Sequence, residues 1–140
     1  MPATIHVIAT TKEGTRAALA RSKQLSAAPI DARVILLVPR IVSLESPPDG
    51  PEEVARISEQ YRQLAAEAGV DASVRLCVGQ RYRDVFRFML GKEASVVVGG
   101  RRRWWWHTAE QDLERELRRA GHSVVFADVA KGLANINRLY

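Results

Sequence analysis

Strand-like and helix-like segments alternate from one end of this 140-residue chain to the other, and this alternation limits the fold more than any other feature. Apolar runs rich in β-branched residues predict five strands, at residues 5–10, 33–39, 72–78, 95–99 and 123–127. Apolar residues at three- and four-residue steps predict four helices between them, at residues 14–26, 51–68, 82–90 and 108–120. Such an order favours a parallel sheet with helices on both faces. We therefore expect an α/β fold, a three-layer open sandwich of four helices around a five-stranded parallel sheet.

Several element ends are marked by residues with a known local role. Pro51 suits the first turn of a helix, and Gly69 suits the left-handed turn that closes it. Thr108 and Gln111 have the spacing of a capping box at the start of the last helix. Pro39 has no N–H to give to a strand ladder, so we expect the second strand to end there.

Length and composition favour one compact unit. We expect a single domain over residues 1–130, which is long enough to bury a core, and a tail at 131–140 that could serve as a dimer arm. Cys77 is the one cysteine, which excludes an internal disulfide and favours the cytoplasm. No apolar run reaches the roughly 20 residues that a membrane-spanning helix needs. The formal charge of +5 favours anionic partners.

The expected strand order places a candidate site. If the strands wind outward from the first and restart at the fourth, the order is 3-2-1-4-5 and the first and fourth strands are neighbours. Ligands bind such sheets beyond the carboxyl ends of those two strands. Thr10, Thr11 and Lys12 come at the end of the first strand, and Gly99, Gly100 and the arginines at 101–103 follow the fourth. We expect these residues to line one crevice.

Three arginines and all three tryptophans come directly after the fourth strand, at residues 101–106. Successive side chains diverge by about 100° in a helix or 180° in a strand, so the three indoles cannot share one face. In one interpretation Trp106 extends the apolar stripe of the last helix, while Trp104 and Trp105 cover the sheet edge and fill gaps. In the other, Trp104 and Trp105 anchor a protein partner, since Trp and Arg are enriched at binding hot spots.

No catalytic or metal-binding pattern accompanies the expected crevice. The chain has no G-x-S-x-G, no P-loop and no paired carboxylates at that position. His6, His107 and His122 lack a second metal ligand at useful spacing. Cys77 lacks a His or acidic partner, and we interpret it as a small buried apolar residue. We expect neither an enzyme nor a metal site.

Taken together, these features resemble the universal stress protein family. The order of elements and the length are similar, as are the Val38-Pro39 pair and the Val-Val-Val-Gly-Gly run at residues 96–100. The resemblance covers residues 3–129 and implies the family's α/β fold.

The resemblance also implies what a nucleotide site would need. ATP-binding members carry an acidic residue after the first strand and a glycine-rich loop, ending in Gly-Ser or Gly-Thr, after the fourth. Here Thr10 stands at the acidic position, Arg102 or Arg103 replaces the second glycine, and Thr108 lies near the final Ser or Thr. Backbone amides cradle phosphates only where no Cβ blocks their approach. We therefore expect the ATP site to be degraded, and we expect no cofactor.

Our first hypothesis is a cytoplasmic regulator or adaptor that acts by protein association as a homodimer, without enzyme activity. The resemblance implies pairing through the last strand, which offers Val124 and Phe126, with support from Leu133 and Ile136 in the tail. A separate protein partner would meet the tryptophans at residues 104–106.

Two alternatives remain open. The chain could bind adenine nucleotides, with the arginines meeting the phosphates and Thr10 and Val38 near the nucleoside. The contacts predicted for that case are Thr10, Thr11, Val38, Gly99, Gly100, Arg101, Arg102, Arg103 and Thr108. The other alternative is weak binding of nucleic acid or another polyanion through the Arg/Trp loop, but the chain offers no recognition helix or RNA-binding signature.

Overall fold

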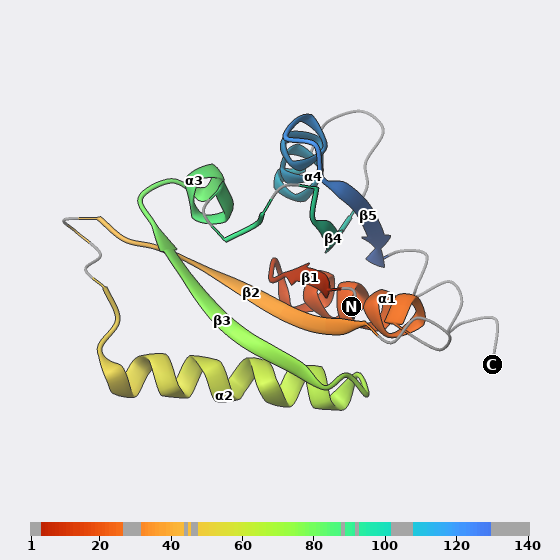
Figure 1. Ribbon diagram of the computed structural model, residues 1–140. Helices are drawn as coiled ribbons and strands as arrows, with labels where there is room; N and C mark the ends of the chain where they lie inside the picture. Colours follow the sequence, from red (N-terminus) through yellow and green to blue (C-terminus); the bar gives the residue numbers. More distant parts are fainter. Residues whose placement is uncertain are drawn as a thin grey trace.

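A computed structural model describes residues 4–26, 32–43, 45, 48–87, 89–91, 93–101 and 108–129 of the chain. Its centre is a five-stranded sheet in the order β3-β2-β1-β4-β5, and every neighbouring pair is parallel (Figure 1). The strands are β1 (Thr4–Ile8), β2 (Arg33–Ile41), β3 (Ala72–Gly79), β4 (Ser95–Gly100) and β5 (Ser123–Asp128). This is the fold class and the strand order that the sequence predicts.

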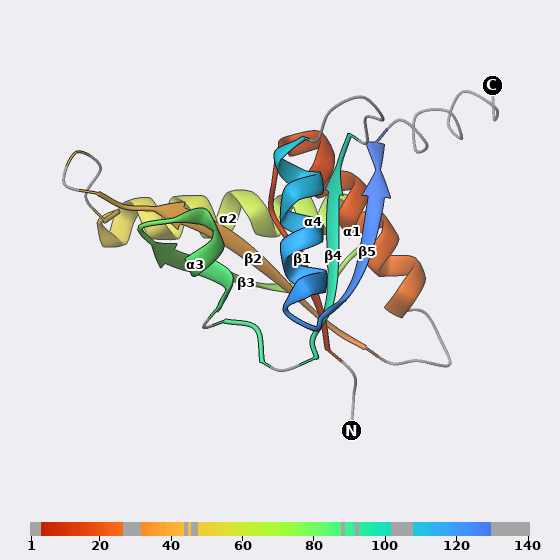
Figure 2. The same ribbon diagram turned by 90° about the horizontal axis from the view of Figure 1, so that it is seen from above.

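Helices cover both faces of the sheet. They are α1 (Lys12–Ser26), α2 (Pro51–Glu67), α3 (Tyr82–Arg87) and α4 (Ala109–Arg119). Leu19 of α1 and Ile57 of α2 belong to one core cluster, whereas Phe86 of α3 and Leu117 of α4 belong to the other. The sheet therefore separates an α1/α2 layer from an α3/α4 layer (Figures 1 and 2).

The central strands are buried on both faces because each layer takes alternate side chains. Five successive residues of β2, Val34 to Val38, are buried. Val34, Leu36 and Val38 face the α1/α2 core, and Ile35 and Leu37 face the α3/α4 core. Burying one such side chain is worth about 1.5–3 kcal/mol, which explains why an unbroken aliphatic run is found in a central parallel strand.

Pro39 does not end β2, and this prediction was wrong. The strand continues to Ile41, with Pro39 paired to Cys77 of β3. The N–H of Ala9 donates to the carbonyl of Leu37, so Leu37 and, two residues on, Pro39 turn their backbone groups toward β1. β1 has already ended at Ile8, so no strand lies beside Pro39 on that side. The missing N–H of the proline therefore costs the sheet no hydrogen bond.

Two marked helix ends agree with the sequence, whereas β1 ends two residues earlier than predicted, α1 begins two residues earlier and α3 ends three residues earlier. Gly69 follows α2 at a φ of +75°, and both halves of the capping box between Thr108 and Gln111 are present. The third helix is shorter than predicted, because it ends at Arg87. The N–H groups of Met89 and Leu90 both donate to the carbonyl of Phe86, which closes the last turn early.

None of the helices in the described part of the chain has the length and apolar character to cross a membrane.

Candidate functional site

A hollow of about 270 Å³ lies beyond the carboxyl end of β1, next to the first turn of α4. We call it the crevice. Its described lining consists of Ala9, Thr10, Thr11, Pro39, Tyr61, Ala109 and Glu110. Thr10 also contacts the end of β4, because its Oγ1 donates to the carbonyl oxygen of Gly99 over 2.7 Å. The ends of β1 and β4 therefore meet where the strand order places them.

Hydrogen bonds from both threonines also shape the turn between β1 and α1. The N–H of Thr10 donates to Oγ1 of Thr15 over 3.0 Å. Oγ1 of Thr11 accepts from the N–H of Gly14 over 3.0 Å and so caps the start of α1. Oγ1 of Thr15 in turn donates to the carbonyl of Thr11 over 2.7 Å. This network fixes how the chain enters α1.

Gly99 and Gly100 are packing positions in this structure. A Cβ on Gly99 would lie 1.8 Å from the carbonyl oxygen of Gly14, so α1 approaches β4 more closely than any side chain allows. A Cβ on Gly100 would lie 2.6 Å from Cγ of Glu110, at the start of α4. Both glycines are buried, and neighbouring elements occupy the space that their missing side chains leave.

Val38 and Thr108 also have structural partners. The side chain of Val38 is 2% exposed and packs in the α1/α2 core, while the next residue, Pro39, lines the crevice. Oγ1 of Thr108 accepts from the N–H of Gln111 and lies 3.0 Å from the carbonyl oxygen of Arg101, to which it can donate. Thr108 thus caps α4 and ties its start to the end of β4.

The charge at the crevice is acidic. Among the described residues of its lining, Glu110 alone carries a charge, and Asp112 adds a second carboxylate in the first turn of α4. Acids at a helix N-terminus complement the helix dipole and reduce the attraction of that end for an anion. Arg101 is exposed at the end of β4. The predicted contacts Arg102 and Arg103 lie outside the described residues, as do Trp104, Trp105 and Trp106.

Sequence reasoning missed five residues of the crevice's described lining, which are Ala9, Pro39, Tyr61, Ala109 and Glu110. Pro39 was interpreted only as the end of a strand. No local signal could have found these residues, because each reaches the crevice through the packing of its element onto the sheet.

His6, His122 and Cys77 have structural environments, and His107 lies outside the described residues. Nδ1 of His122 accepts from the N–H of Ala94 over 3.0 Å, and Nδ1 of His6 lies 3.3 Å from the carbonyl oxygen of Ser95. Burial lowers the pKa of His6, an effect that the contact with Ser95 partly offsets. Cys77 is buried, as predicted, and burial raises the pKa of its thiol. No three His, Cys, Asp or Glu side chains within the described ranges gather in a way that could hold a metal ion.

The predicted dimer residues of the last strand lie at the sheet edge, because β5 is the last strand in the order and pairs with β4 among the described residues. Val124 and Phe126 are partly buried against the α3/α4 core. Leu133 and Ile136 fall in the tail, outside the described residues.

Comparisons with known proteins identify the fold. No protein-family model and no curated protein matches the sequence. Solved structures do match. A universal stress protein in complex with cAMP aligns with a TM-score of 0.57 at 18% identity, over 91% of this chain and 97% of that one. This chain has the universal stress protein fold.

Two further solved structures support this assignment of the fold. A universal stress protein from Archaeoglobus fulgidus aligns with a TM-score of 0.60 at 12% identity, over 89% of this chain and 92% of that one. A universal stress protein family member from Burkholderia pseudomallei aligns with a TM-score of 0.56 at 18% identity, over 89% and 95%. The likeness spans nearly the whole of each chain, so most of this sequence belongs to the matched fold.

Proposed function

We propose that this chain is a universal-stress-protein-like regulator or adaptor of the cytoplasm, which acts by protein association as a homodimer and catalyses no reaction. We further propose that it does not bind ATP in the way of the family's ATP-binding members. The observation that carries the second proposal is the packing of Gly99 against Gly14, because backbone amides need open space to cradle a phosphate and α1 covers Gly99.

The other residues of the crevice support the same conclusion. A triphosphate is strongly negative and needs cations or free amides around it. The described lining offers the carboxylate of Glu110, and the Thr10 hydroxyl already donates to Gly99. Oγ1 of Thr11 accepts from Gly14, which leaves its proton as a single neutral donor. These residues do not fit an ATP phosphate chain.

Thermal unfolding tests this proposal. Magnesium ATP at about 5 mM is expected to leave the melting temperature unchanged, because a ligand stabilises a protein only if it binds the native state. A rise of several degrees that saturates with ATP concentration would contradict the proposal.

The geometry of β5 supports association through the sheet edge. The N–H of Ser123 donates to the carbonyl of Ala94, so Ser123 and Val125 turn their backbone groups inward, toward β4. Val124 and Phe126 then turn theirs outward. In agreement with this alternation, Arg118 donates to the carbonyl oxygen of Val124 over 3.1 Å. An outer edge of this kind can pair with the same edge of a second copy.

A proline substitution tests the dimer. Val124→Pro removes an outward N–H and leaves the bonds to β4 in place, whereas the control Val124→Ala keeps that N–H. Light scattering at micromolar concentration is expected to give a dimer for the wild-type protein and for Val124→Ala, and a monomer for Val124→Pro. A monomeric wild-type protein would contradict the dimer, and a dimeric Val124→Pro variant would exclude β5 as its interface.

Adenine-nucleotide binding is the second candidate, and one observation favours it. Arg101 is exposed directly beyond β4, where the chain continues into two further arginines. One structure of this fold holds cAMP. Its single phosphate needs fewer cations or amide donors around it than a triphosphate does. This candidate predicts that ATP or cAMP raises the melting temperature and that Arg102→Ala with Arg103→Ala abolishes the rise. If neither nucleotide shifts the melting temperature, this candidate fails.

A further inference from the structure

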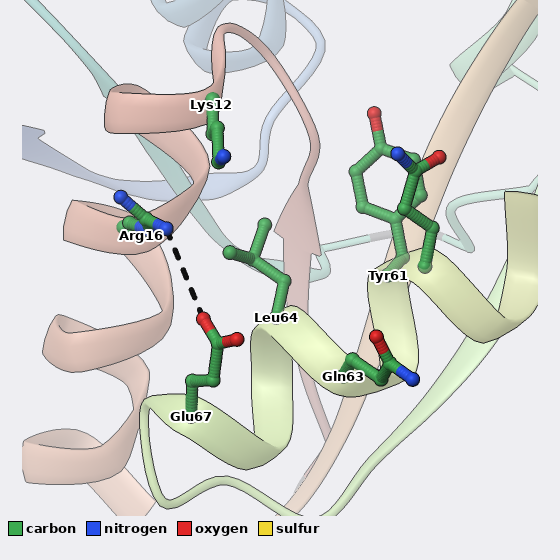
Figure 3. A pocket seen from close by; sticks show the side chains of 7 residues that line it. Lys12, Arg16, Tyr61, Gln63, Leu64 and Glu67 are labelled. Atoms are coloured by element: carbon green, nitrogen blue, oxygen red, sulfur yellow. Dashed lines mark ion pairs between the residues drawn. The ribbon is translucent and has the colours of Figure 1, made fainter.

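A second hollow, of about 320 Å³, lies between α1 and α2 on the α1/α2 layer (Figure 3). We call it the α1–α2 groove. Lys12 and Arg16 line it from α1, and Tyr61, Gln63, Leu64 and Glu67 line it from α2 (Figure 3). It shares Tyr61 with the crevice but none of the crevice's other described lining. The groove therefore has its own set of polar groups.

The cations of the groove outnumber its acids. Lys12 and Arg16 are four residues apart on α1, so they lie on one face of the helix, one turn apart. Nη2 of Arg16 lies 3.8 Å from Oε2 of Glu67, in the ion pair drawn in Figure 3. Both of these side chains are more than half exposed, at 52% and 67%, so water weakens the pair. No ion pair or hydrogen bond within the described residues involves the side chain of Lys12.

The α2 wall combines apolar surface with neutral polar groups. The ring of Tyr61 and the side chain of Leu64 are partly buried against the α1/α2 core, and both also line the groove. Gln60 and Gln63 add amide groups that can donate or accept hydrogen bonds. Small-molecule sites commonly have this character, with an apolar wall and a few charged or polar groups that orient the ligand.

We propose that the α1–α2 groove binds a small organic anion, with one phosphate or carboxylate group on a flat ring. Lys12 and Arg16 hold the anionic group through charge-assisted hydrogen bonds. The ring of the ligand packs against Tyr61 and Leu64. Glu67 competes with the ligand for Arg16, because its carboxylate lies within ion-pair distance of the guanidinium, at 3.8 Å.

Four probe compounds separate the parts of this proposal. Phenyl phosphate and benzoate carry a ring with each kind of anion, inorganic phosphate carries the anion alone, and benzamide carries the ring alone. In an amide NMR titration, one of the two ring anions is expected to give saturating shifts at Arg16, Tyr61 and Gln63, and the better one identifies the preferred anionic group. Inorganic phosphate and benzamide are expected to bind at least about tenfold more weakly, because each lacks one of the two contacts.

A charge-removing substitution on each helix tests the mechanism in opposite directions. Lys12→Gln is expected to weaken binding of the better ring anion by about fivefold or more, because one cation is lost. Its control is Lys23→Gln, which makes the same charge change on α1 outside the groove. Glu67→Gln is expected to tighten binding by about threefold, because it frees Arg16. Its control is Glu59→Gln on α2, which lies outside the groove and pairs with Arg62. A misfolded variant cannot produce tighter binding.

The binding experiments test the α1–α2 groove independently of the proposed function. Opposite effects of Lys12→Gln and Glu67→Gln, with both controls near wild type, would support the groove. Absence of saturating shifts for both ring anions, or equal effects of Lys12→Gln and Lys23→Gln, would overturn it. Shifts centred on Thr10, Gly99 and Glu110 would place the ligand in the crevice and would also overturn it. If the ATP prediction fails, ATP will shift the resonances of crevice residues, and the result for the groove will not change.

Discussion

The contact between Gly99 and Gly14 shows how much one missing side chain can determine. The first turn of α1 lies directly against β4 at this point, and Oγ1 of Thr10 bonds to the carbonyl of Gly99 beside it. The sequence predicts that Gly99 lies near the crevice, but it cannot say what occupies the space above the glycine. A phosphate and a helix backbone both need a residue without a Cβ, and only the packing of α1 distinguishes them.

A matched pair of alanine substitutions tests this contact. Gly99→Ala is expected to destabilise the protein by more than about 3 kcal/mol, because the new Cβ meets the backbone of α1. Gly91→Ala is the control, since a Cβ at Gly91 would meet nothing within 4 Å, and its effect is expected to stay within about 1 kcal/mol. Urea unfolding measures both values. Equal effects of the two substitutions would contradict the packing role of Gly99.

At the scale of the element, the helix boundaries follow from short-range chemistry that a sequence displays. The capping box at Thr108 and the turn at Gly69 involve residues within a few positions of each other, and both were predicted. The path of β2 through Pro39 was not predicted, because it depends on where the neighbouring strand β1 ends. A boundary that depends on a neighbouring element therefore cannot be predicted from a local sequence pattern.

The capping box gives a prediction of its own. Oγ1 of Thr108 accepts from the N–H of Gln111 over 3.2 Å, and the N–H of Thr108 donates to Oε1 of Gln111 over 3.1 Å. Thr108→Ala removes the hydroxyl and is expected to cost about 1 kcal/mol in the free energy of unfolding. Thr108→Ser keeps the hydroxyl, and its cost is expected to stay below about 0.5 kcal/mol. A similar loss in both variants, measured by urea unfolding, would show that the threonine methyl matters more than the cap.

At the scale of the whole molecule, the strand order could be predicted because few topologies join alternating strands and helices by right-handed crossovers. The lengths over which neighbouring strands pair could not be predicted. β2 and β3 pair over eight positions, from Val34 with Ala72 to Ile41 with Gly79, whereas β1 pairs with β2 over five. The far half of the β2/β3 ladder therefore extends beyond β1 (Figure 2). Strand length reflects how far the covering helices reach, and that distance is a property of the assembled fold.

The stability of the folded chain is expected to fall in mild acid, partly through His6. Burial lowers the pKa of its imidazole below the ordinary value of 6.5, so the unfolded chain binds a proton first as the pH falls. Stability is therefore complete above about pH 6.5 and decreases as the pH falls from there toward the lower pKa of the folded state. His6→Gln removes this contribution.

Urea unfolding at about pH 7.5 and pH 5.5 measures the effect. The wild-type protein is expected to lose more stability between these two conditions than His6→Gln does. Equal losses would show that the acid sensitivity does not come from His6.

The most direct test of the proposed function is an amide NMR titration with magnesium ATP, followed at Thr10, Gly99 and Gly100. We predict that these three resonances stay in place up to about 5 mM ATP, because α1 and Glu110 fill the space above the glycines. Saturating shifts at all three would contradict the claim that packing over the two glycines leaves no site for a triphosphate.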